Sequence, residues 1–480
     1  MRAVSDVGSG AELPAQLRDR LGAILGAQGL VADAGTRYGE SWGGAFTAPP
    51  SLVARPGSTA EVAATVAACA EAGVAMVPQG GNTGLAGGAQ PTRPGCVIIS
   101  LERMRAVRAL DPVNDTITVE AGMTLAEVQA RAAEVDRLFP LSLASEGSCQ
   151  IGGNLSTNAG GTQCLRYGNA RAMALGLEVV LPDGQIWEGL RGLRKDATGY
   201  DLKQLFIGAE GTLGIITAAV LRLLPRPRDA ATAFVAVPDP AAALRLLDRA
   251  RRHLGESLTG FEVMRRECLD WVLVALPGTA SPFAERHPWY VLIEATGQGA
   301  PGTLAGLMAE ALAAALEEEI VSDATLAASE AQRRRLWALR EGQAEAQKAA
   351  GFGIKHDVSV PVSAVPTFLA RADAALAAAL PGIRPFAFGH LGDGNIHYNP
   401  LGPAGASAAE VAALRPGANR IVHDIVADLG GSISAEHGLG QLRTEEVRRY
   451  KSPVEQAMMA ALKRSFDPKG LMNPGTIVPA

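Results

Sequence analysis

The chain has 480 residues, of which 48% are hydrophobic and 19% are charged, so we expect two or three globular domains with sizeable cores. The formal net charge is −5 and the basic residues are scattered, which argues against a nucleic-acid partner and against a polybasic membrane-binding surface. The five cysteines form an odd set without a C-x-x-C pair, which favours a reducing compartment over a disulfide framework. The first thirty residues carry charges, and no run of about 18 apolar residues follows, so we expect a cytoplasmic protein without a transmembrane segment.

Residues 50–225 alternate short β-branched runs with Gly-rich turns and short helices, a texture typical of a mixed α/β or α+β domain. The runs are CVIIS from Cys96, TITVEAG from Thr116, LGLEVVLPDG from Leu175 and LGIITAAVLRLLP from Leu213. The sequence PRPRD at 225–229 then marks a boundary.

Residues 230–385 differ in texture, because Ala-rich amphipathic stretches alternate with strand-like runs such as WYVLIEA. The helices are expected near 240–254, 304–319 and 365–380. We therefore predict an α+β second domain, and we place the divisions of the chain at 1–228, 229–425 and 426–480.

Three Gly-rich stretches occur in the first domain. They are PQGGNTGLAGG at 78–88, SEGSCQIGGNLSTNAGG at 145–161 and GAEGTLGII at 208–216. Backbone N–H groups in such loops can converge on a pyrophosphate, and Ser156, Thr157 and Asn158 can add hydrogen bonds. A single such loop indicates only a turn, whereas three in one domain favour a large anionic or planar cofactor.

A further glycine pattern lies deeper in the chain. Gly297, Gly299 and Gly302 match G-x-G-x-x-G between a strand-like run and a helical stretch, which by pattern alone is a dinucleotide fingerprint. Against it, Pro301 stiffens the turn, and no strand ending in an acidic residue follows at the usual distance. A nicotinamide-dependent dehydrogenase is therefore the less favoured alternative.

Four groups suited to metal binding or proton transfer occupy two short segments, GHLGDGNIHYN at 389–399 and SAEHGLG at 434–440. The turn formers between His390 and His397 predict a tight turn with one imidazole at each end. With Glu436 as a third ligand, these two histidines would hold a borderline divalent ion that keeps positions open for substrate. Adjacent side chains diverge, so His437 is left to act as an acid or base. The alternative is that these histidines only cap strands or donate to carbonyls.

Taken in order, PQGGNTGL, EGSCQIGGNLSTNAGG, GAEGTLGIIT, GHLGDGNIH, SAEHGLG and DPKGLMNPG resemble the motifs of the flavoproteins of vanillyl-alcohol-oxidase fold. The match is to the D-2-hydroxyacid dehydrogenases of that family and covers about residues 45–478. The resemblance implies an FAD-binding domain at 1–228, a substrate or cap domain of α+β class at 229–425, and a C-terminal segment at 426–480 that completes the active site.

The resemblance also implies where FAD binds. The loop from Pro78 to Gly84 matches the pyrophosphate loop, 147–161 matches the segment along the ribityl chain and isoalloxazine, and Gly211 and Ile216 match adenine contacts. Members with covalent flavin carry a His where this chain has Asn82 and Thr83, so non-covalent FAD is expected. The implied cofactor-binding residues are Pro78, Gly80, Gly81, Asn82, Thr83, Gly84, Ser145, Gly147, Gly152, Gly153, Asn154, Thr157, Asn158, Gly160, Gly211, Ile216 and Asn473.

On the substrate side the resemblance makes His390, His397 and Glu436 the ligands of a divalent metal, with zinc expected, and His437 the catalytic base. Arg340 matches the residue that binds the substrate carboxylate, and Asn399 a polar residue beside the metal. Lys355 matches a lysine that holds the distal carboxylate in the hydroxyglutarate enzymes. Ala344 departs from the Thr or Ser that assists this lysine, which leaves room for another distal group.

The expected reaction is FAD-dependent oxidation of D-2-hydroxyglutarate to 2-oxoglutarate, with D-lactate or glycolate as the alternative substrates. The flavin would be reoxidised by an electron-transfer flavoprotein, a quinone or oxygen, and a homodimer would be unsurprising. A flavoprotein that binds metal or transfers electrons without turning over a small molecule is the alternative from another class.

Overall fold

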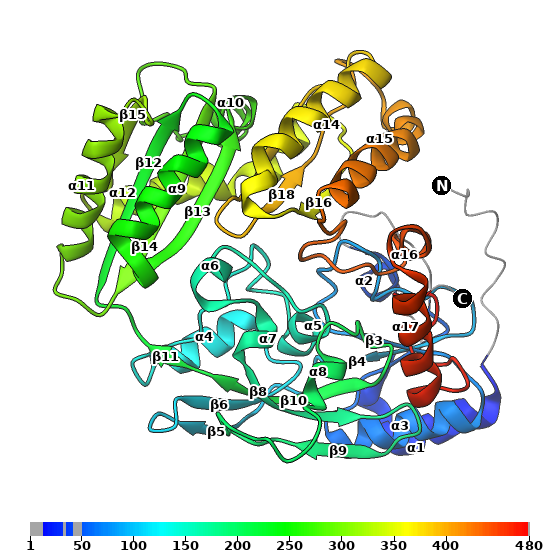
Figure 1. Ribbon diagram of the computed structural model, residues 1–480. Coiled ribbons are helices and arrows are strands. Elements are labelled where there is room, and N and C mark those ends of the chain that lie inside the picture. The colour runs from blue at the N-terminus through cyan, green and yellow to red at the C-terminus, as the bar shows by residue number, and fades with distance from the viewer. Residues whose placement is uncertain (1–12, 32–34, 42–49, 479–480) are drawn as a thin grey trace. The chain divides into compact units, whose positions relative to one another are not determined.

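The computed structural model describes residues 13–31, 35–41 and 50–478, which form two compact units (Figure 1). The first unit contains the chain up to Ala159, then Asn169–Pro225 and the segment from Glu436 onward. The second unit contains Gly160–Gly168 and Arg226–Ala435. The outermost parts of the predicted segments 1–228 and 426–480, residues 1–12 and 479–480, lie outside the described residues.

The first unit contains a four-stranded and a five-stranded sheet. The four-stranded sheet has the order β1 (Leu30–Val31), β2 (Leu52–Ala54), β4 (Val97–Ser100) and β3 (Met76–Gln79), of which β2, β4 and β3 are parallel. The antiparallel five-stranded sheet has the order β5 (Val107–Asp111), β6 (Thr116–Glu120), β10 (Ile215–Arg222), β8 (Ala174–Val180) and β9 (Ile186–Gly189). Four of these strands, β4, β6, β8 and β10, coincide with the predicted β-branched runs, because mostly apolar runs suit strands that are largely buried.

The remaining elements of the first unit are mostly short helices. They are α1 (Ala15–Gly29), α2 (Gly35–Gly39), α3 (Thr59–Glu71), α4 (Leu125–Ala133), α5 (Ile151–Ser156), α7 (Ala170–Met173), α8 (Lys203–Phe206), α16 (Thr444–Tyr450) and α17 (Pro453–Phe466), with the two-residue strands β7 (Arg137–Leu138) and β11 (Leu224–Pro225). Thr124 and Glu127 form a capping box that starts α4. The C-terminal segment returns to the edge of β3, where Met472 forms a parallel bridge with Met76.

The second unit is built on one seven-stranded antiparallel sheet. Its order is β15 (Asp323–Leu326), β12 (Asp229–Val237), β14 (Trp289–Gly297), β13 (Leu258–Arg265), β17 (Ala387–His390), β18 (Asn395–Tyr398) and β16 (Asp357–Ser359). The predicted helices are present as α9 (Pro240–Leu254), α11 (Thr303–Glu317) and α14 (Val365–Ala379), which share one core with α15 (Ala408–Asp428). The opposite core contains residues of α10 (Arg266–Ala275), α12 (Glu330–Glu341) and α13 (Gln343–Ala350). The short helix α6 (Cys164–Tyr167) completes this unit.

Alternation along the strands decides which side chains face which core. In β13, Phe261 and Val263 belong to the core with α9 and α14, and Met264 belongs to the core with α12 and α13. Because successive strand residues point to opposite faces, Glu262 shares the face of Met264. By the same rule His390, His397 and Asp357 also lie on the face that α12 and α13 cover, since Ala387, Ile396 and Val358 belong to the other core.

The histidine segment forms a hairpin, as predicted. His390 ends β17, Asn395 begins β18, and the four residues between them form the turn. Gly394 is required there, because its φ is +85° and a Cβ would lie 2.2 Å from the carbonyl oxygen of Val360.

The G-x-G-x-x-G stretch joins β14 to α11, which is the strand–loop–helix context of a dinucleotide fingerprint. However, the Asp229 carboxylate accepts hydrogen bonds from the N–H groups of Gly302 (2.9 Å) and Leu304 (2.8 Å). A carboxylate of the chain itself therefore occupies the place where a pyrophosphate would bind. This geometry argues against nicotinamide binding at 297–302.

Among the described residues one stretch, Val362–Ala379, is long and apolar enough to be compared with a membrane span. It includes α14, whose residues Val365, Phe368, Leu369, Ala372 and Leu376 are buried in the core of the second unit. Its apolar side chains thus have a place in the protein core.

Candidate active site

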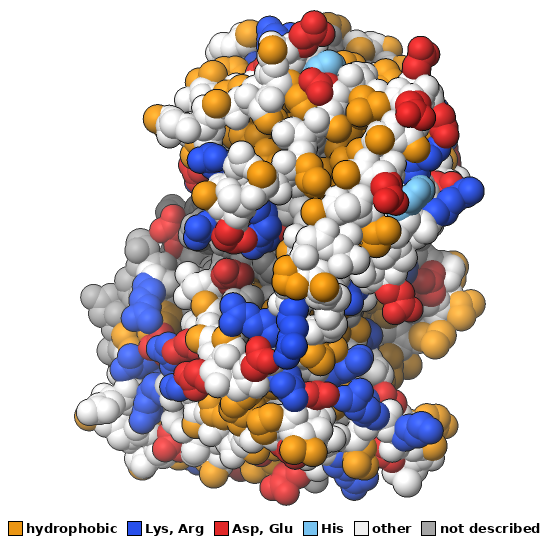
Figure 2. Space-filling model, turned by 90° about the vertical axis from the view of Figure 1, so that its left-hand side faces the viewer, with side chains coloured by type: hydrophobic (Ala, Val, Ile, Leu, Met, Phe, Trp, Pro, Cys, Tyr) orange, Lys and Arg blue, Asp and Glu red, His pale blue; other side chains and the backbone are white. Residues whose placement is uncertain are grey.

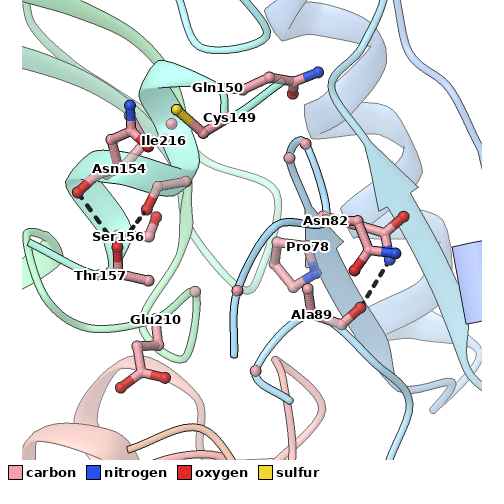
Figure 3. Close-up of a pocket in the computed structure, with 18 of the residues that line it drawn as sticks. Pro78, Asn82, Ala89, Cys149, Gln150, Asn154, Ser156, Thr157, Glu210 and Ile216 are labelled. Atoms are coloured by element: carbon pink, nitrogen blue, oxygen red, sulfur yellow. Dashed lines mark hydrogen bonds between the residues drawn. The ribbon is translucent and has the colours of Figure 1, made fainter. Parts of the chain in front are cut away.

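The first unit contains a cavity that opens to solvent. All three predicted Gly-rich loops line it. The polar lining includes Gln79, Asn82, Thr83, Gln150, Asn154, Ser156, Thr157, Glu210 and His437. Figure 3 shows Asn154, Ser156 and Thr157 on one side, and on the other side Pro78 of β3 and Asn82 of the loop that follows β3.

The glycines of the cavity wall serve two different purposes. A Cβ on Gly81 would lie 2.0 Å from the carbonyl oxygen of Ser148, so close packing of the two loops requires glycine there. Gly84 and Gly153 also line the cavity, but a Cβ on either would meet no atom within 4 Å, and neither has a positive φ. These two glycines leave space that a bound molecule can fill.

Two buried amides in this wall have unused hydrogen-bonding atoms. Gln150 is 8% exposed and Asn154 is 5% exposed. Among the described residues, the Oε1 of Gln150 and the Nδ2 of Asn154 have no hydrogen-bond partner. Because buried polar atoms are normally paired, both are suited to a polar ligand in the cavity. The bare backbone, the open glycines and these amides fit a large planar cofactor with a pyrophosphate.

The structure places most of the predicted cofactor residues in the cavity wall. These are Pro78, Gly80, Gly81, Asn82, Thr83, Gly84, Gly152, Gly153, Asn154, Thr157, Gly211 and Ile216. Ser145, Gly147, Asn158 and Asn473 belong to the same unit but do not line the cavity, and Gly160 belongs to the second unit. Asn473 instead braces the wall, since its Nδ2 donates to the backbone oxygens of Gly88 and Glu210 at 2.8 and 2.7 Å.

Glu210 is a wall residue that the sequence analysis missed. Its carboxylate accepts hydrogen bonds from the N–H groups of Leu439 and Gly440, both at 2.8 Å. Burial raises the pKa of Glu210, and these two donors together with Arg443 offset that effect only in part. The two hydrogen bonds fasten the SAEHGLG segment to the cavity, and His437 lines the cavity wall. The only feature of the sequence that could have pointed to Glu210 is that it is an acidic residue within the Gly-rich stretch GAEGTLG.

In the second unit, Glu262 joins two of the predicted site residues. Its Oε1 lies 2.7 Å from Nδ1 of His390, and its Oε2 accepts from Nε of Arg340 at 2.7 Å. Glu262 is 1% exposed. Burial alone raises the pKa of Glu262, but the charges of His390 and Arg340 and their hydrogen bonds hold it below its ordinary value.

His397 lies beside His390, with 5.5 Å between the ring centroids. On the adjacent strand Asp357 faces His397, its Oδ1 3.8 Å from Nδ1. Asp357 also accepts a hydrogen bond from Nδ2 of Asn395 at 3.0 Å. The second unit therefore presents two imidazoles and a carboxylate in one place. The carboxylate was missed because Asp357 lies 33 positions before His390 and 40 before His397 in the sequence.

Two of the predicted substrate residues, Arg340 and Asn399, contact groups on the face of the sheet that α12 and α13 cover. The guanidinium of Arg340 lies 5.0 Å from the Phe388 ring centroid, and its Nη atoms make no hydrogen bond among the described residues. Asn399 accepts from the N–H of His356 and donates to Gln347. Ala344 and Lys355 are exposed. Although the surface of Lys355 is accessible, the surrounding chain excludes part of the nearby solvent, and this desolvation together with the charge of Lys348 lowers the pKa of Lys355 below the ordinary lysine value.

Glu436 and His437 belong to the first unit, where Oε1 of Glu436 lies 3.8 Å from Nε2 of His437. Glu436 directly follows Ala435, whose N–H donates to the carbonyl oxygen of Asp357 at 3.1 Å within the second unit.

Lys and Arg side chains are interspersed with Asp and Glu side chains on the face shown in Figure 2. Oppositely charged side chains also form ion pairs. For example, Nε of Arg137 lies 2.7 Å from Oδ1 of Asp115. Many basic residues of the described surface thus have an acidic neighbour.

Two family descriptions match the chain. The family described as "FAD binding domain" matches residues 50–189, and the family described as "FAD linked oxidases, C-terminal domain" matches residues 226–477. Together they cover most of the chain, including the Gly-rich loops at 78–88 and 145–161 and both histidine segments, whereas the loop at 208–216 lies between the two matches.

Among curated proteins, the chain is 40% identical over 440 residues to D-2-hydroxyglutarate dehydrogenase of Xanthomonas citri pv. viticola, covering 92% of each chain. It is also 40% identical over 428 residues to the mitochondrial D-2-hydroxyglutarate dehydrogenase of Bos taurus, covering 89% of this chain and 77% of the bovine one. Among solved structures, p-cresol methylhydroxylase matches with a TM-score of 0.76 and 18% identity over 97% of this chain and 96% of that chain.

The likeness to p-cresol methylhydroxylase confirms the predicted vanillyl-alcohol-oxidase fold. At 18% sequence identity this match supports the fold alone and not a function. Two family matches and relatives at 40% identity over nearly the whole chain establish kinship. The cavity in the first unit lies within the part of the chain that matches the FAD-binding family, apart from its last wall segments. The chain therefore belongs to the FAD-linked oxidase family and is an FAD-dependent oxidoreductase.

Proposed function

We propose that the protein oxidises D-2-hydroxyglutarate to 2-oxoglutarate with FAD as the oxidant. The observation that carries this proposal is the position of His437 in the wall of the flavin cavity, where a base can meet a substrate lying on the flavin. The names of the relatives and the lysine at position 355 support the choice of a dicarboxylic hydroxyacid.

The roles of the chain's own groups follow from their chemistry. The two Nη atoms of Arg340 bind the 1-carboxylate in a bidentate manner, since its Nε is already held by Glu262. His437 removes the hydroxyl proton as the Cα–H bond breaks. Bound FAD supplies the acceptor for the hydride from Cα. The protein thus contributes orientation and one proton acceptor, which together account for much of the rate advantage.

We also propose His390, His397 and Glu436 as ligands of a divalent metal, with zinc expected and with Asn399 beside it. Two imidazoles and a carboxylate are a donor set that suits zinc. Such an ion would supply Lewis acidity for the substrate hydroxyl. Asp357 is an additional carboxylate beside His397 and can serve as its hydrogen-bonding partner.

The flavin is proposed to be non-covalent. Asn82, at the place of the attachment residue, is fixed by hydrogen bonds to Glu40 and Gln90 and is not a nucleophile. Cys149 also lines the cavity, but burial raises its pKa and keeps it a thiol. Acid precipitation should therefore release all FAD into the supernatant.

In this proposal 1–228 is the flavin domain, 229–425 is the substrate domain, and 426–480 completes the active site through Glu436 and His437. An electron-transfer flavoprotein or a quinone is the proposed electron acceptor, and a homodimer in the cytoplasm is the proposed state. The bovine relative is named as mitochondrial, so fractionation of the source cells decides the compartment.

A substrate panel tests the proposed function. D-2-hydroxyglutarate, D-malate, D-lactate and glycolate are compared with an artificial electron acceptor, and kcat/KM for D-2-hydroxyglutarate is expected to be highest. Ala344 favours the alternative, because the residue that assists the lysine is missing. A higher kcat/KM for D-lactate would establish that alternative instead.

Gly153→Ala is expected to remove FAD without unfolding the protein. The new methyl would enter the cavity, whereas alanine in helix α5 slightly favours folding. Gly306→Ala in α11 is the matched control, because that glycine also has no atom within 4 Å but lies outside the cavity. The ratio of flavin to protein absorbance should fall at least about tenfold for Gly153→Ala alone, which corresponds to about 1.4 kcal/mol. Equal flavin content in both variants would contradict the assignment of this wall to FAD.

Lys355→Ala is expected to lower kcat/KM for D-2-hydroxyglutarate about 10- to 100-fold and to leave D-lactate nearly unchanged. The loss follows from one charge-assisted hydrogen bond to the distal carboxylate. Because the pKa of Lys355 is lowered, the wild-type KM for D-2-hydroxyglutarate should begin to rise with pH before an ordinary lysine loses its charge. Lys451→Ala, which removes a lysine paired with Glu455, is the control. Equal losses on both substrates would reject the assignment.

A further inference from the structure

A buried carboxylate links the metal-binding and substrate-binding groups of the second unit. Glu262 makes one hydrogen bond with each of its oxygens, to His390 and to Arg340, and both are 2.7 Å long. Its side chain is almost fully excluded from solvent, and Arg340 and His390 are themselves 7% and 6% exposed. The three groups form one array in which every member depends on the same carboxylate.

The backbone fixes this array. In the pairing of β13 with β17, Glu262 is the direct partner of His390, and the two side chains share one face of the sheet. Arg340 is the next-to-last residue of α12, whose residues Leu336, Trp337 and Leu339 are buried in the core on that face. The array is therefore built on a strand pair and a packed helix, which hold it more rigidly than loops would.

Each hydrogen bond has a consequence for its partner. A histidine that donates from Nδ1 to a carboxylate keeps its Nε2 lone pair for a metal, and such outer partners orient the ring and raise its basicity. An arginine that donates from Nε is fixed along its axis, so its two Nη atoms stay together as a fork for a carboxylate.

We propose that Glu262 is a positioning residue that holds His390 ready for the metal and Arg340 ready for the substrate carboxylate, so that its loss weakens both binding events at once. This inference rests on the proposed function. It adds that metal binding and substrate binding both depend on Glu262, which is itself neither a metal ligand nor a substrate-binding residue.

The experiment compares Glu262→Gln with Glu294→Gln. Glu294 is the matched control, because it is also a buried carboxylate on the same sheet, 4% exposed, and is hydrogen-bonded to Arg333 and Trp337. Zn²⁺ affinity is measured by competition with a chromogenic chelator, and kcat and KM are measured separately with D-2-hydroxyglutarate. Glu262→Gln is expected to weaken Zn²⁺ binding about 10- to 100-fold and to raise KM, with unchanged FAD content. Glu294→Gln should leave both quantities near their wild-type values.

Two further variants separate the two arms of the array. Arg340→Lys keeps the positive charge and should raise KM with little effect on Zn²⁺ affinity, and His390→Ala should abolish tight Zn²⁺ binding. In the double variant Glu262→Gln with Arg340→Lys, the increase in KM should be smaller than the product of the single effects, because the two residues act through one contact.

The outcomes are distinguishable from failure of the proposed function. Wild-type protein that binds no Zn²⁺ or oxidises no hydroxyacid would reject the proposed function itself. A wild type with both activities and a Glu262→Gln variant that matches Glu294→Gln in Zn²⁺ affinity and KM would overturn the inference alone. If Glu262→Gln does not fold, Glu262→Asp takes its place: it keeps the charge but is one methylene too short to reach both partners, and wild-type values in it would likewise overturn the inference.

Discussion

Replacement of His437 by alanine should lower turnover with D-2-hydroxyglutarate by about two to four orders of magnitude while FAD remains bound. General base catalysis by a positioned side chain contributes a factor of this size. The flavin should remain because His437 is one residue in a wall that is mostly supplied by the three Gly-rich loops. The rate of flavin reduction in anaerobic stopped-flow mixing measures the defect in hydride transfer that the missing base causes, and the flavin absorbance of the same sample measures cofactor content.

His253→Ala is the control for His437. The His253 ring lies on α9, where it is hydrogen-bonded to the carbonyl oxygen of Arg249, far along the chain from both histidine segments. This variant should reduce its flavin at the wild-type rate. If His437→Ala also retains more than about a tenth of the wild-type rate, another group must take the proton, because a missing general base lowers the rate more than that.

Removal of the proposed divalent metal should cause a loss of similar size. A substrate hydroxyl without a Lewis acid keeps its high pKa, and deprotonation by an imidazole becomes correspondingly harder. Dialysis against a chelator should abolish oxidation of D-2-hydroxyglutarate while the flavin spectrum stays unchanged, and added Zn²⁺ should restore the activity. Metal content before and after dialysis is measured on the same samples.

His397→Ala tests the same site without a chelator. It removes one of the proposed ligands, and the purified variant should contain little zinc and retain its FAD. Chelated protein and a zinc-free His397→Ala variant that both turn over at the wild-type rate would show that the histidines have a structural role only.

The strands and helices could be predicted from the sequence wherever the apolar pattern is continuous. The run at 96–100 forms β4, the Ala-rich stretch near 240–254 forms α9, and the predicted turn after His390 is the turn of a hairpin at 391–394. In each case the local pattern and the tertiary environment favour the same conformation. The Gly-rich loops were recognisable for a similar reason, since few other structures need so much bare backbone.

The parts that could not be predicted depend on contacts between distant segments. Glu262 lies 128 positions before His390, and only the register of β13 against β17 makes them neighbours. Glu210 and Leu439 are 229 positions apart. A lone Glu in a strand or in a Gly-rich loop has no local feature that marks it as a partner of either segment.

The roles of individual glycines could not be predicted either, because they too depend on neighbouring atoms in the folded chain. Gly81 and Gly153 look alike in sequence, yet the first is required by a neighbouring carbonyl and the second leaves open space in the cavity. The reverse holds for the G-x-G-x-x-G stretch, whose local pattern is right but whose helix N-terminus is already hydrogen-bonded to Asp229.

Anaerobic mixing of the purified yellow protein with D-2-hydroxyglutarate tests the central claim most directly, since it needs no external electron acceptor. The flavin absorbance should be bleached within a single turnover, one equivalent of 2-oxoglutarate should form per flavin, and added NAD should change nothing. A flavin that stays oxidised with D-2-hydroxyglutarate, D-malate, D-lactate and glycolate alike would contradict the account.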